Sequence, residues 1–307
     1  MSKTALLFAG QGAQTVGMGR DLAAAFPTAQ SWFDRANDAL GYDLASICFN
    51  GPDAELTKTE HAQPGIFLVS WIAFELLKER VAITFEATAG LSLGEFTALT
   101  AAGAMSFEDG LRVVRQRGRF MQEACDVTQG GMAAVIGLDE APTREVCAEA
   151  GVVLANLNCP GQLVISGESE KILKAVDLAR AKGARKAIPL PVAGAYHSPL
   201  MASAQPKLEA ELAKITMNAT RVPVISNVAA LPYGRPNQIS VGLVEQVTSS
   251  VRWEASMRCL INQGFTRFIE LGPGTALSGF MKRISKDVQM LNVADVGSLE
   301  ATVQALV

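Results

Sequence analysis

The fold is decided by the stretch Ala89-Gly90-Leu91-Ser92-Leu93-Gly94-Glu95. Before it, Phe85–Thr88 can form a short strand, and after it the small and apolar residues of Glu95–Gly103 suit a buried helix. A G-x-S-x-G sequence between a strand and a helix is typical of a nucleophile elbow, a tight turn on which glycines avoid backbone collisions. The stretch therefore predicts Ser92 as a nucleophile, with the Leu93 N–H as a donor to a developing oxyanion.

The composition indicates a folded globular protein with a large core. The 307 residues allow one large domain, or a large domain with a smaller one inserted. Hydrophobic residues make up 49% and charged residues 19%, which excludes a disordered chain. The net charge of −3 provides no overall attraction to nucleic acid or to an anionic membrane. The apolar run Ala5–Ala9 is too short for a signal peptide or a membrane span.

The five cysteines are spread through the chain, and no two of them form a C-x-x-C pair. This pattern favours reduced cysteines of the core over disulfides or a zinc site. We therefore expect a cytoplasmic protein without a metal.

A first buried strand is predicted by the continuous apolar run Thr4–Ala9. The run ends in the loop Gly10-Gln11-Gly12-Ala13-Gln14, which superficially looks like a dinucleotide-binding fingerprint. The G-x-G-x-x-G spacing fails, because Thr15 occupies the place of the third glycine. We interpret the loop as a source of side-chain and backbone donors at the carboxyl end of a strand, where open α/β sheets build their sites.

Further elements of the larger unit follow from periodicity. Amphipathic or buried patterns predict five helices, at Ala29–Leu40, Ile66–Glu79, Leu111–Cys125, Pro199–Ile215 and Ala276–Ile284. Strands are predicted at Val222–Ser226 and Phe268–Leu271, and a closing helix at Leu299–Val307.

A different order of elements begins at the glycine pair Gly130-Gly131. It is strand, helix, strand, strand, helix, strand, at Met132–Gly137, Thr143–Ala150, Val152–Asn156, Gln162–Gly167, Glu170–Lys182 and Lys186–Pro189, with a turn at Asn158–Gly161. The order β-α-β-β-α-β is typical of a ferredoxin-like unit. We therefore predict an α/β fold. A large α/β-hydrolase-like domain with a mostly parallel sheet, residues 1–127 and 193–307, carries an inserted small ferredoxin-like domain, residues 128–192.

A serine nucleophile needs a base, because its hydroxyl is unreactive at neutral pH. The chain has two histidines, and His61 lies in a loop or first turn, where we interpret it as structural. His197 lies between the turn residues Gly194 and Pro199 and follows Ser92, in the order of nucleophile and base seen in α/β serine hydrolases. We predict His197 as the general base. Many carboxylates lie between the two residues, so the choice of an acidic third member stays open.

Six short motifs together resemble the bacterial malonyl-CoA:acyl-carrier-protein transacylase family. In chain order they are Phe8–Gln14, Gly90–Glu95, Arg117–Gln122, Asn158–Gln162, Tyr196–Met201 and Glu270–Gly274. Each motif alone is weak, but the six in this order, with a ferredoxin-like insert between elbow and histidine, are highly specific.

The resemblance implies a ping-pong acyl transfer. Ser92 would attack the malonyl thioester and hold the acyl group as an ester, and His197 would take the serine proton and later activate the incoming thiol. Gln11 and the Leu93 amide would form the oxyanion hole. A main-chain carbonyl near the position of Gln246 would orient the histidine, which accounts for the lack of an obvious third acid.

The resemblance also implies that Arg117 binds the free carboxylate that distinguishes malonyl from acetyl, since a guanidinium can donate two parallel hydrogen bonds. Its neighbours Arg115 and Arg119 are interpreted as solvated residues of the same helix. The family usually has a histidine where this chain has Leu91, which alters the polar surroundings of the pocket but not the attacking group. Tyr196 occupies a position where related acyltransferases vary with the size of the extender unit.

The predicted function is transfer of malonyl from malonyl-CoA to the phosphopantetheine thiol of acyl carrier protein, in fatty-acid synthesis. The predicted partners are these two molecules, with no cofactor, metal, nucleic acid or membrane. One alternative is a serine hydrolase or thioesterase that uses water as acceptor. Another is an acyltransferase for a different CoA extender unit in polyketide synthesis. A non-catalytic docking domain is disfavoured because Ser92, His197 and Arg117 are all present.

Overall fold

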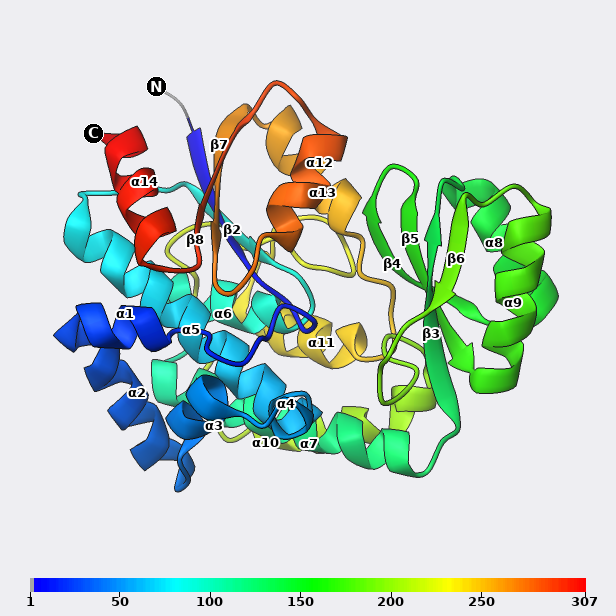
Figure 1. Cartoon of the computed structure of the whole chain (residues 1–307), viewed down its shortest axis with the longest axis horizontal. Helices are drawn as coiled ribbons and strands as arrows, with labels where there is room; N and C mark the ends of the chain where they lie inside the picture. Colours follow the sequence, from blue (N-terminus) through cyan, green and yellow to red (C-terminus); the bar gives the residue numbers. More distant parts are fainter. Residues whose placement is uncertain (1–2) are drawn as a thin grey trace.

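The computed structural model describes residues 3–307, whose strands form two separate sheets (Figure 1). The first sheet is parallel, with the order β2-β1-β7-β8, and consists of Lys3–Phe8 (β1), Ala87–Gly90 (β2), Phe265–Leu271 (β7) and Gln289–Val293 (β8). The second is antiparallel, with the order β4-β5-β3-β6, and consists of Gly130–Ile136 (β3), Val153–Cys159 (β4), Gln162–Glu168 (β5) and Lys186–Pro189 (β6). This is the predicted α/β class.

Helices surround the parallel sheet. In chain order they are α1 (Arg20–Ala25), α2 (Pro27–Leu40), α3 (Leu44–Asn50), α4 (Asp53–Leu56), α5 (Thr59–Arg80), α6 (Leu93–Ala101), α7 (Phe107–Asp126), the 3-10 helix η1 (Pro199–Ala204), α10 (Gln205–Leu212), α11 (Pro236–Gln246), α12 (Trp253–Asn262), α13 (Ala276–Ile284) and α14 (Val296–Leu306).

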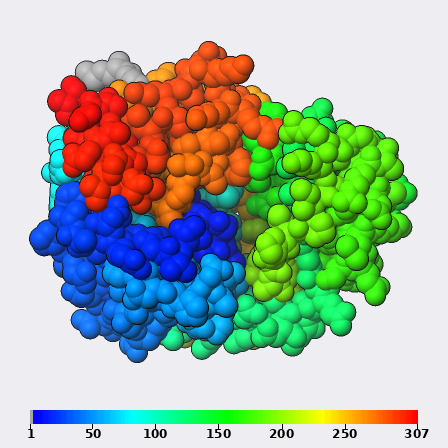
Figure 2. Space-filling view, in the orientation of Figure 1, coloured from blue at the N-terminus to red at the C-terminus, as the bar shows by residue number. Residues whose placement is uncertain are grey.

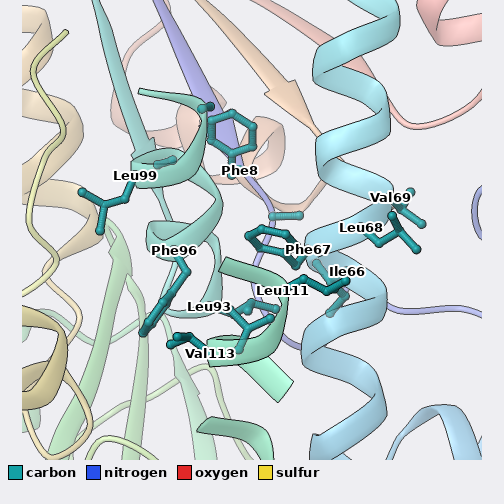
Figure 3. Packing of buried hydrophobic residues seen from close by; sticks show 14 of the residues in the cluster. Phe8, Ile66, Phe67, Leu68, Val69, Leu93, Phe96, Leu99, Leu111 and Val113 are labelled. Carbon is teal, nitrogen blue, oxygen red and sulfur yellow. The ribbon is translucent and has the colours of Figure 1, made fainter. Parts of the chain in front are cut away.

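Strand β1 lies in the middle of the parallel sheet because both of its faces are apolar. Ala5 and Leu7 are fully buried in a cluster that includes apolar residues of α12 and α13. Leu6 and Phe8 point to the opposite face and join the largest core cluster, to which α5, α6 and α7 contribute. Figure 3 shows Phe8 with the buried side chains of these three helices. The alternation of β1 between two cores is the expected property of a strand that is covered on both sides.

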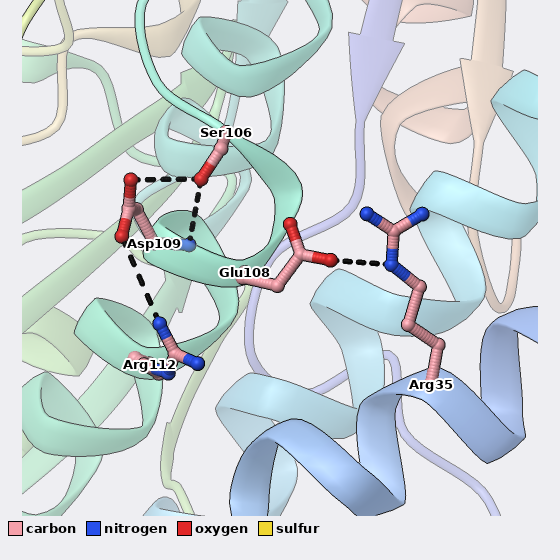
Figure 4. A network of polar contacts seen from close by, with 5 residues as sticks. All are labelled: Arg35, Ser106, Glu108, Asp109 and Arg112. Atoms are coloured by element: carbon pink, nitrogen blue, oxygen red, sulfur yellow. Dashed lines mark hydrogen bonds and ion pairs between the residues drawn. The ribbon is translucent and has the colours of Figure 1, made fainter.

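Helix α7 is fixed at its N-terminus by polar contacts (Figure 4). The Ser106 hydroxyl accepts a hydrogen bond from the Asp109 N–H over 3.1 Å, which satisfies one of the free amides of the first turn. Glu108 in the same turn forms an ion pair with Arg35 of α2. The start of α7 is thereby capped and held against α2.

The antiparallel sheet and its two helices form the predicted ferredoxin-like unit. Helices α8 (Glu140–Ala150) and α9 (Ser169–Ala181) alternate with the strands as predicted. β3 pairs with β5 from Gly130↔Glu168 to Ile136↔Gln162, and the unit has a hydrophobic cluster of its own. The limits of the small domain at residues 128 and 192 stay a prediction, and we propose them because β3 to β6 all lie between them.

Main-chain hydrogen bonds join the antiparallel sheet to a loop of the larger unit. The Val251 N–H donates to the carbonyl of Ala155 in β4 over 2.8 Å, and the Val251 carbonyl accepts from the Leu157 N–H over 2.9 Å. Val251 lies between α11 and α12 of the larger unit. β4 therefore continues its pairing into the other part of the molecule.

The predicted strand Val222–Ser226 is reduced to isolated bridges. Val224 makes a parallel bridge to Thr88 of β2, and Ile225 an antiparallel one to Pro232. Pro223 and Pro232 lack the N–H groups that a longer ladder needs.

Three further differences from the prediction have an identifiable local cause. The helix expected at Pro199–Ile215 is divided into η1 and α10, because Pro206 has no N–H to continue the hydrogen-bond pattern. Asn158 and Cys159 belong to β4, so the turn is confined to Pro160-Gly161. β8 was not predicted, since its buried and exposed residues do not alternate.

Within residues 3–307, no helix has the combination of length and apolar character needed to cross a bilayer. The five cysteines are unpaired, and four of them are buried.

Helix α6 approaches β1 so closely that only glycine fits at the contact. A Cβ at Gly94 would lie 2.2 Å from the Phe8 carbonyl oxygen and 2.8 Å from that of Ala9. We expect Gly94→Ala to lower the free energy of unfolding by about 1–3 kcal/mol, the usual cost of overpacking. The measurement is urea denaturation.

Gly279→Ala is the matched control, because Gly279 lies inside α13 with nothing within 4 Å of an added Cβ. There alanine should raise the free energy of unfolding by up to about 1 kcal/mol, through helix propensity. Equal stability of the two variants would contradict the close approach of α6 to β1.

Candidate active site

Ser92 lies on a strained turn between β2, which ends at Gly90, and α6, which begins at Leu93. Its φ and ψ angles are 51° and −103°, a region that residues with a Cβ rarely adopt. A Cβ at Gly90 would lie 1.9 Å from the carbonyl group of Gly94, so the two glycines permit the turn as predicted. The elbow therefore has the strand, the turn and the helix that its sequence indicated.

Asn227 holds the two sides of this turn together. Its side-chain oxygen accepts a hydrogen bond from the Ser92 N–H over 2.6 Å, and its side-chain nitrogen donates to the Gly90 carbonyl over 2.8 Å. The residue is 1% exposed. Sequence analysis missed Asn227, because it lies in a loop far along the chain and belongs to none of the quoted motifs.

His197 faces the serine through a defined ring nitrogen. Its Nε2 lies 2.8 Å from the Ser92 Oγ, and its Nδ1 lies 2.9 Å from the main-chain oxygen of Gln246. A carbonyl can only accept, so Nδ1 carries the proton and Nε2 presents a lone pair to the hydroxyl. Burial and the nearby Arg117 lower the pKa of His197 to about 4, which keeps the imidazole neutral and its Nε2 free to accept a proton at pH 7.

Arg117 reaches the same hydroxyl from the buried side of α7. Its Nη2 donates to the Ser92 Oγ over 3.2 Å and to Gln246 Oε1 over 2.9 Å, and its Nη1 donates to Gln63 Oε1 over 2.8 Å. The side chain is 1% exposed, and burial lowers the pKa of Arg117 to about 10, so it stays charged at neutral pH. Among the described residues, its Nε has no partner. Gln63 was not found from the sequence.

The other arginines of α7 lie away from this site. Arg119 is exposed and pairs with Glu123 over 3.5 Å, as a solvated residue would. The interpretation of Arg115 as solvated was wrong: it is half-buried and stacks over the ring of Tyr42. His61 is likewise remote and lies 3.1 Å from a carboxylate oxygen of Glu55.

The loop after β1 lies beside the elbow because β1 and β2 are parallel neighbours, with Phe8 paired to Gly90. Gln11 in this loop accepts a hydrogen bond from Gln63 over 3.3 Å. Leu93 is the first residue of α6, so its N–H is one of the amides that a helix leaves without an internal partner. Both predicted oxyanion donors are therefore next to the turn that carries Ser92.

A cleft of about 1130 Å³ leads to the serine, and its lining comes from both parts of the molecule. Gln11, Ser92 and His197 line it from the larger unit, and Met132, Asn158 and Val164 from the antiparallel sheet. Figure 2 shows a hollow between the green residues of that sheet and the blue residues after β1.

Two residues of the quoted motifs also line the cleft. Leu91 is half-buried, and its N–H donates to the Phe8 carbonyl over 3.1 Å. Tyr196 places its hydroxyl 2.8 Å from the hydroxyl of Thr59, and burial raises the pKa of Tyr196 to about 12, so the phenol is neutral. Within residues 3–307, no three histidine, cysteine, aspartate or glutamate side chains are grouped to hold a metal ion.

Glu95, one turn after Ser92, is a further residue whose contacts the sequence did not reveal. It is fully buried in α6, and its carboxylate accepts hydrogen bonds from Asn227, Tyr233 and Gln246.

Comparison with known proteins agrees with this geometry. Residues 5–305 match the family described as "Acyl transferase domain". The chain is 45% identical to the malonyl CoA-acyl carrier protein transacylase of Bacillus subtilis, over 100% of this chain and 98% of that protein. It is 36% identical to the solved transacylase of the same name from Coxiella burnetii, with a TM-score of 0.96 over 99% of this chain and 98% of that one.

A third similar structure is a malonyl-transacylase in complex with a type II PKS acyl-carrier protein. It is 37% identical, with a TM-score of 0.96, over 99% of this chain and 100% of that one. The chain therefore belongs to the acyl transferase domain family and, within it, to the malonyl CoA-acyl carrier protein transacylases.

Proposed function

We propose that this protein transfers the malonyl group from malonyl-CoA to the phosphopantetheine thiol of an acyl carrier protein through an ester of Ser92. One observation carries the proposal: a neutral imidazole and a buried guanidinium meet at one hydroxyl. The Ser92 Oγ is 2.8 Å from His197 Nε2 and 3.2 Å from Arg117 Nη2. A base and a carboxylate-binding cation at the same nucleophile fit a short acyl group with a free carboxylate.

In the first half-reaction, the Ser92 oxygen attacks the thioester carbonyl while His197 Nε2 takes the hydroxyl proton. The Gln246 carbonyl supports the resulting imidazolium through the Nδ1–H. Gln11 and the Leu93 N–H stabilise the developing oxyanion, and each such donor is worth about 3–4 kcal/mol. The carbon–sulfur bond then breaks, and the CoA sulfur leaves with the proton from Nε2.

The second half-reaction reverses these roles. His197 Nε2 takes the proton of the carrier-protein thiol, and the sulfur attacks the ester carbonyl. The bond from carbon to the Ser92 oxygen breaks, and the serine recovers its proton from the imidazolium. The enzyme returns to its starting state without a cofactor.

Arg117 supports malonyl as the acyl group. A buried cation beside the serine would be left with an apolar acyl chain instead of a carboxylate, which disfavours an esterase or lipase for apolar acyl groups. Tyr196, tied to Thr59, adds bulk beside His197 and supports an extender unit without a large substituent. We also infer a cytoplasmic location, supported by the unpaired and mostly buried cysteines.

Replacement of the nucleophile tests the covalent step. Wild-type protein treated with malonyl-CoA should show a malonyl adduct on Ser92 by mass spectrometry, and Ser92→Ala should show none. His197→Ala should slow formation of the adduct by roughly 100- to 10,000-fold, the contribution of a general base. An adduct on Ser92→Ala, or a His197→Ala rate within twofold of wild type, would contradict the assignment.

The fate of the adduct separates transferase from hydrolase. With radiolabelled malonyl-CoA and no carrier protein, a transferase holds the label on the serine, whereas a hydrolase releases it to water. Addition of holo carrier protein should then move the label to the carrier. Loss of the label at the same rate with and without carrier would favour the thioesterase alternative.

Replacement of Arg117 tests the substrate. Arg117→Ala should lower kcat/KM for malonyl-CoA. The corresponding loss of transition-state stabilisation should be at least about 2 kcal/mol, the scale for truncating one partner of a buried charge pair. The kcat/KM for acetyl-CoA should stay the same or rise, because the mutation removes a cation that the acetyl group leaves unpaired.

The control is Arg119→Ala, which removes an exposed arginine of the same helix and should leave kcat/KM unchanged for both malonyl-CoA and acetyl-CoA. Equal losses for malonyl and acetyl in Arg117→Ala would show that the residue acts only on the structure of the site.

A further inference from the structure

Glu95 is a carboxylate enclosed by donors. It is 0% exposed and lies on the first turn of α6. Its Oε1 accepts from the Tyr233 hydroxyl over 2.6 Å and from the Asn227 N–H over 3.2 Å, and its Oε2 accepts from Gln246 Nε2. Three donors on one buried carboxyl group favour the ionised form and fix its position.

Two of these partners hold the reacting groups. The side chain of Asn227 bonds both the Ser92 N–H and the Gly90 carbonyl, so its position sets the elbow. The main-chain oxygen of Gln246 orients His197, and its side-chain nitrogen donates to the Ser92 carbonyl over 2.9 Å. The Glu95 carboxylate therefore contacts Asn227 and Gln246, which position Ser92 and His197, and contacts neither the Ser92 hydroxyl nor the His197 ring itself.

The Gln246 amide lies between two opposite charges. Its Oε1 accepts from Arg117, and its Nε2 donates to Glu95. An amide turned the other way would direct its N–H groups at the guanidinium and its oxygen at the carboxylate. The carboxylate thus determines which way the amide lies, and the amide in turn holds the Arg117 Nη2 that contacts the serine hydroxyl.

We propose that Glu95 is a positioning residue for the transfer reaction: it holds Asn227 and Gln246 so that His197 and Arg117 converge on Ser92. The role in malonyl transfer rests on the proposed function. Glutamine cannot replace the glutamate, because its amide nitrogen is itself a donor and would face at least one of the three donors that contact the carboxylate.

The carboxyl group of Glu95 titrates near neutral pH. Burial raises the pKa of Glu95 to about 7, against the opposing effects of its three donors and of Arg117. The charged or titratable groups that face it are Arg117 and Tyr233, and burial beside the carboxylate keeps Tyr233 neutral by raising its pKa. As the pH falls through 7, Glu95 gains a proton and loses an acceptor site, while His197, with a pKa of about 4, stays unprotonated.

The test compares Glu95→Gln with Glu270→Gln. Glu270 is also 0% exposed, and its carboxylate also accepts three hydrogen bonds, from the Leu277 N–H and from the N–H and hydroxyl of Ser278. These contacts hold the start of α13 and do not involve Ser92, His197 or Arg117. Glu270 also borders the cleft, so the absolute rate of this variant is not compared, only its stability and the shape of its pH profile. Both substitutions should lower the temperature of unfolding, so the control separates a loss of stability from a loss of positioning.

The readout is the rate of acylation by malonyl-CoA in single-turnover rapid quench from pH 5.5 to 8.5, a step that needs no acceptor thiol. In wild-type protein and Glu270→Gln the rate should fall as the pH drops through 7. Glu95→Gln should be at least tenfold slower at pH 8 and show no such fall. A rate within twofold of wild type at pH 8, or an unchanged pH profile, would overturn the proposal.

Tyr233→Phe provides a second test that does not depend on the folding of Glu95→Gln. Loss of one donor to the carboxylate raises the pKa of Glu95, so the fall in rate should move to higher pH. A profile identical to that of wild type would overturn the proposal.

The reaction of Ser92 with a fluorophosphonate distinguishes failure of this inference from failure of the proposed function. It requires the serine and its base but no malonyl group. A tenfold loss of labelling in Glu95→Gln supports the positioning role even if wild-type protein forms no malonyl ester. Wild-type labelling of folded Glu95→Gln would overturn the role.

Discussion

The site depends on the burial of one positive charge. Removal of a guanidinium from water costs several kcal/mol unless acceptors replace the solvent, and Arg117 finds them in Gln63, Gln246 and the Ser92 hydroxyl. Burial and, after it, the same charge lower the pKa of His197, and the charge opposes the effect of burial on the pKa of Glu95. The group proposed to bind the substrate carboxylate therefore adds to the effect of burial in keeping the base unprotonated. Because each of these groups is a partner of another, the site has one self-consistent arrangement.

Local sequence predicted the elements that are made from neighbouring residues. The elbow at Ser92 is such a case, because strand, glycine spacing and helix lie within a few positions of one another. The ferredoxin-like order was predicted for the same reason, since each strand and helix has its own pattern. The prediction of His197 as the base followed from its being one of only two histidines. The roles of Gln11, Gln246 and Arg117 were predicted only from the resemblance.

What the sequence could not predict comes from contacts between distant segments. Asn227 lies 135 positions from Ser92, and nothing in its surroundings marks it as a hydrogen-bond partner. Arg115 was misread because an amphipathic pattern separates buried from exposed faces but does not identify a residue on the boundary, where it stacks on Tyr42. The strand expected at Val222–Ser226 failed because Pro223 within it and Pro232 opposite it lack the N–H groups of a longer ladder, although Val224 and Ile225 are buried. In each case tertiary structure decided what local pattern left open.

The bonds between Val251 and β4 have a consequence for how the cleft admits its ligands. Two main-chain hydrogen bonds join the small sheet to the segment between α11 and α12, shortly after Gln246. A swing of the small sheet away from the rest would have to break both bonds, which cost about 0.5–1.5 kcal/mol each, so they oppose a widening of the cleft. We therefore expect a long thioester arm to enter the cleft lengthwise, with adjustment of side chains and without a hinge motion of the small sheet.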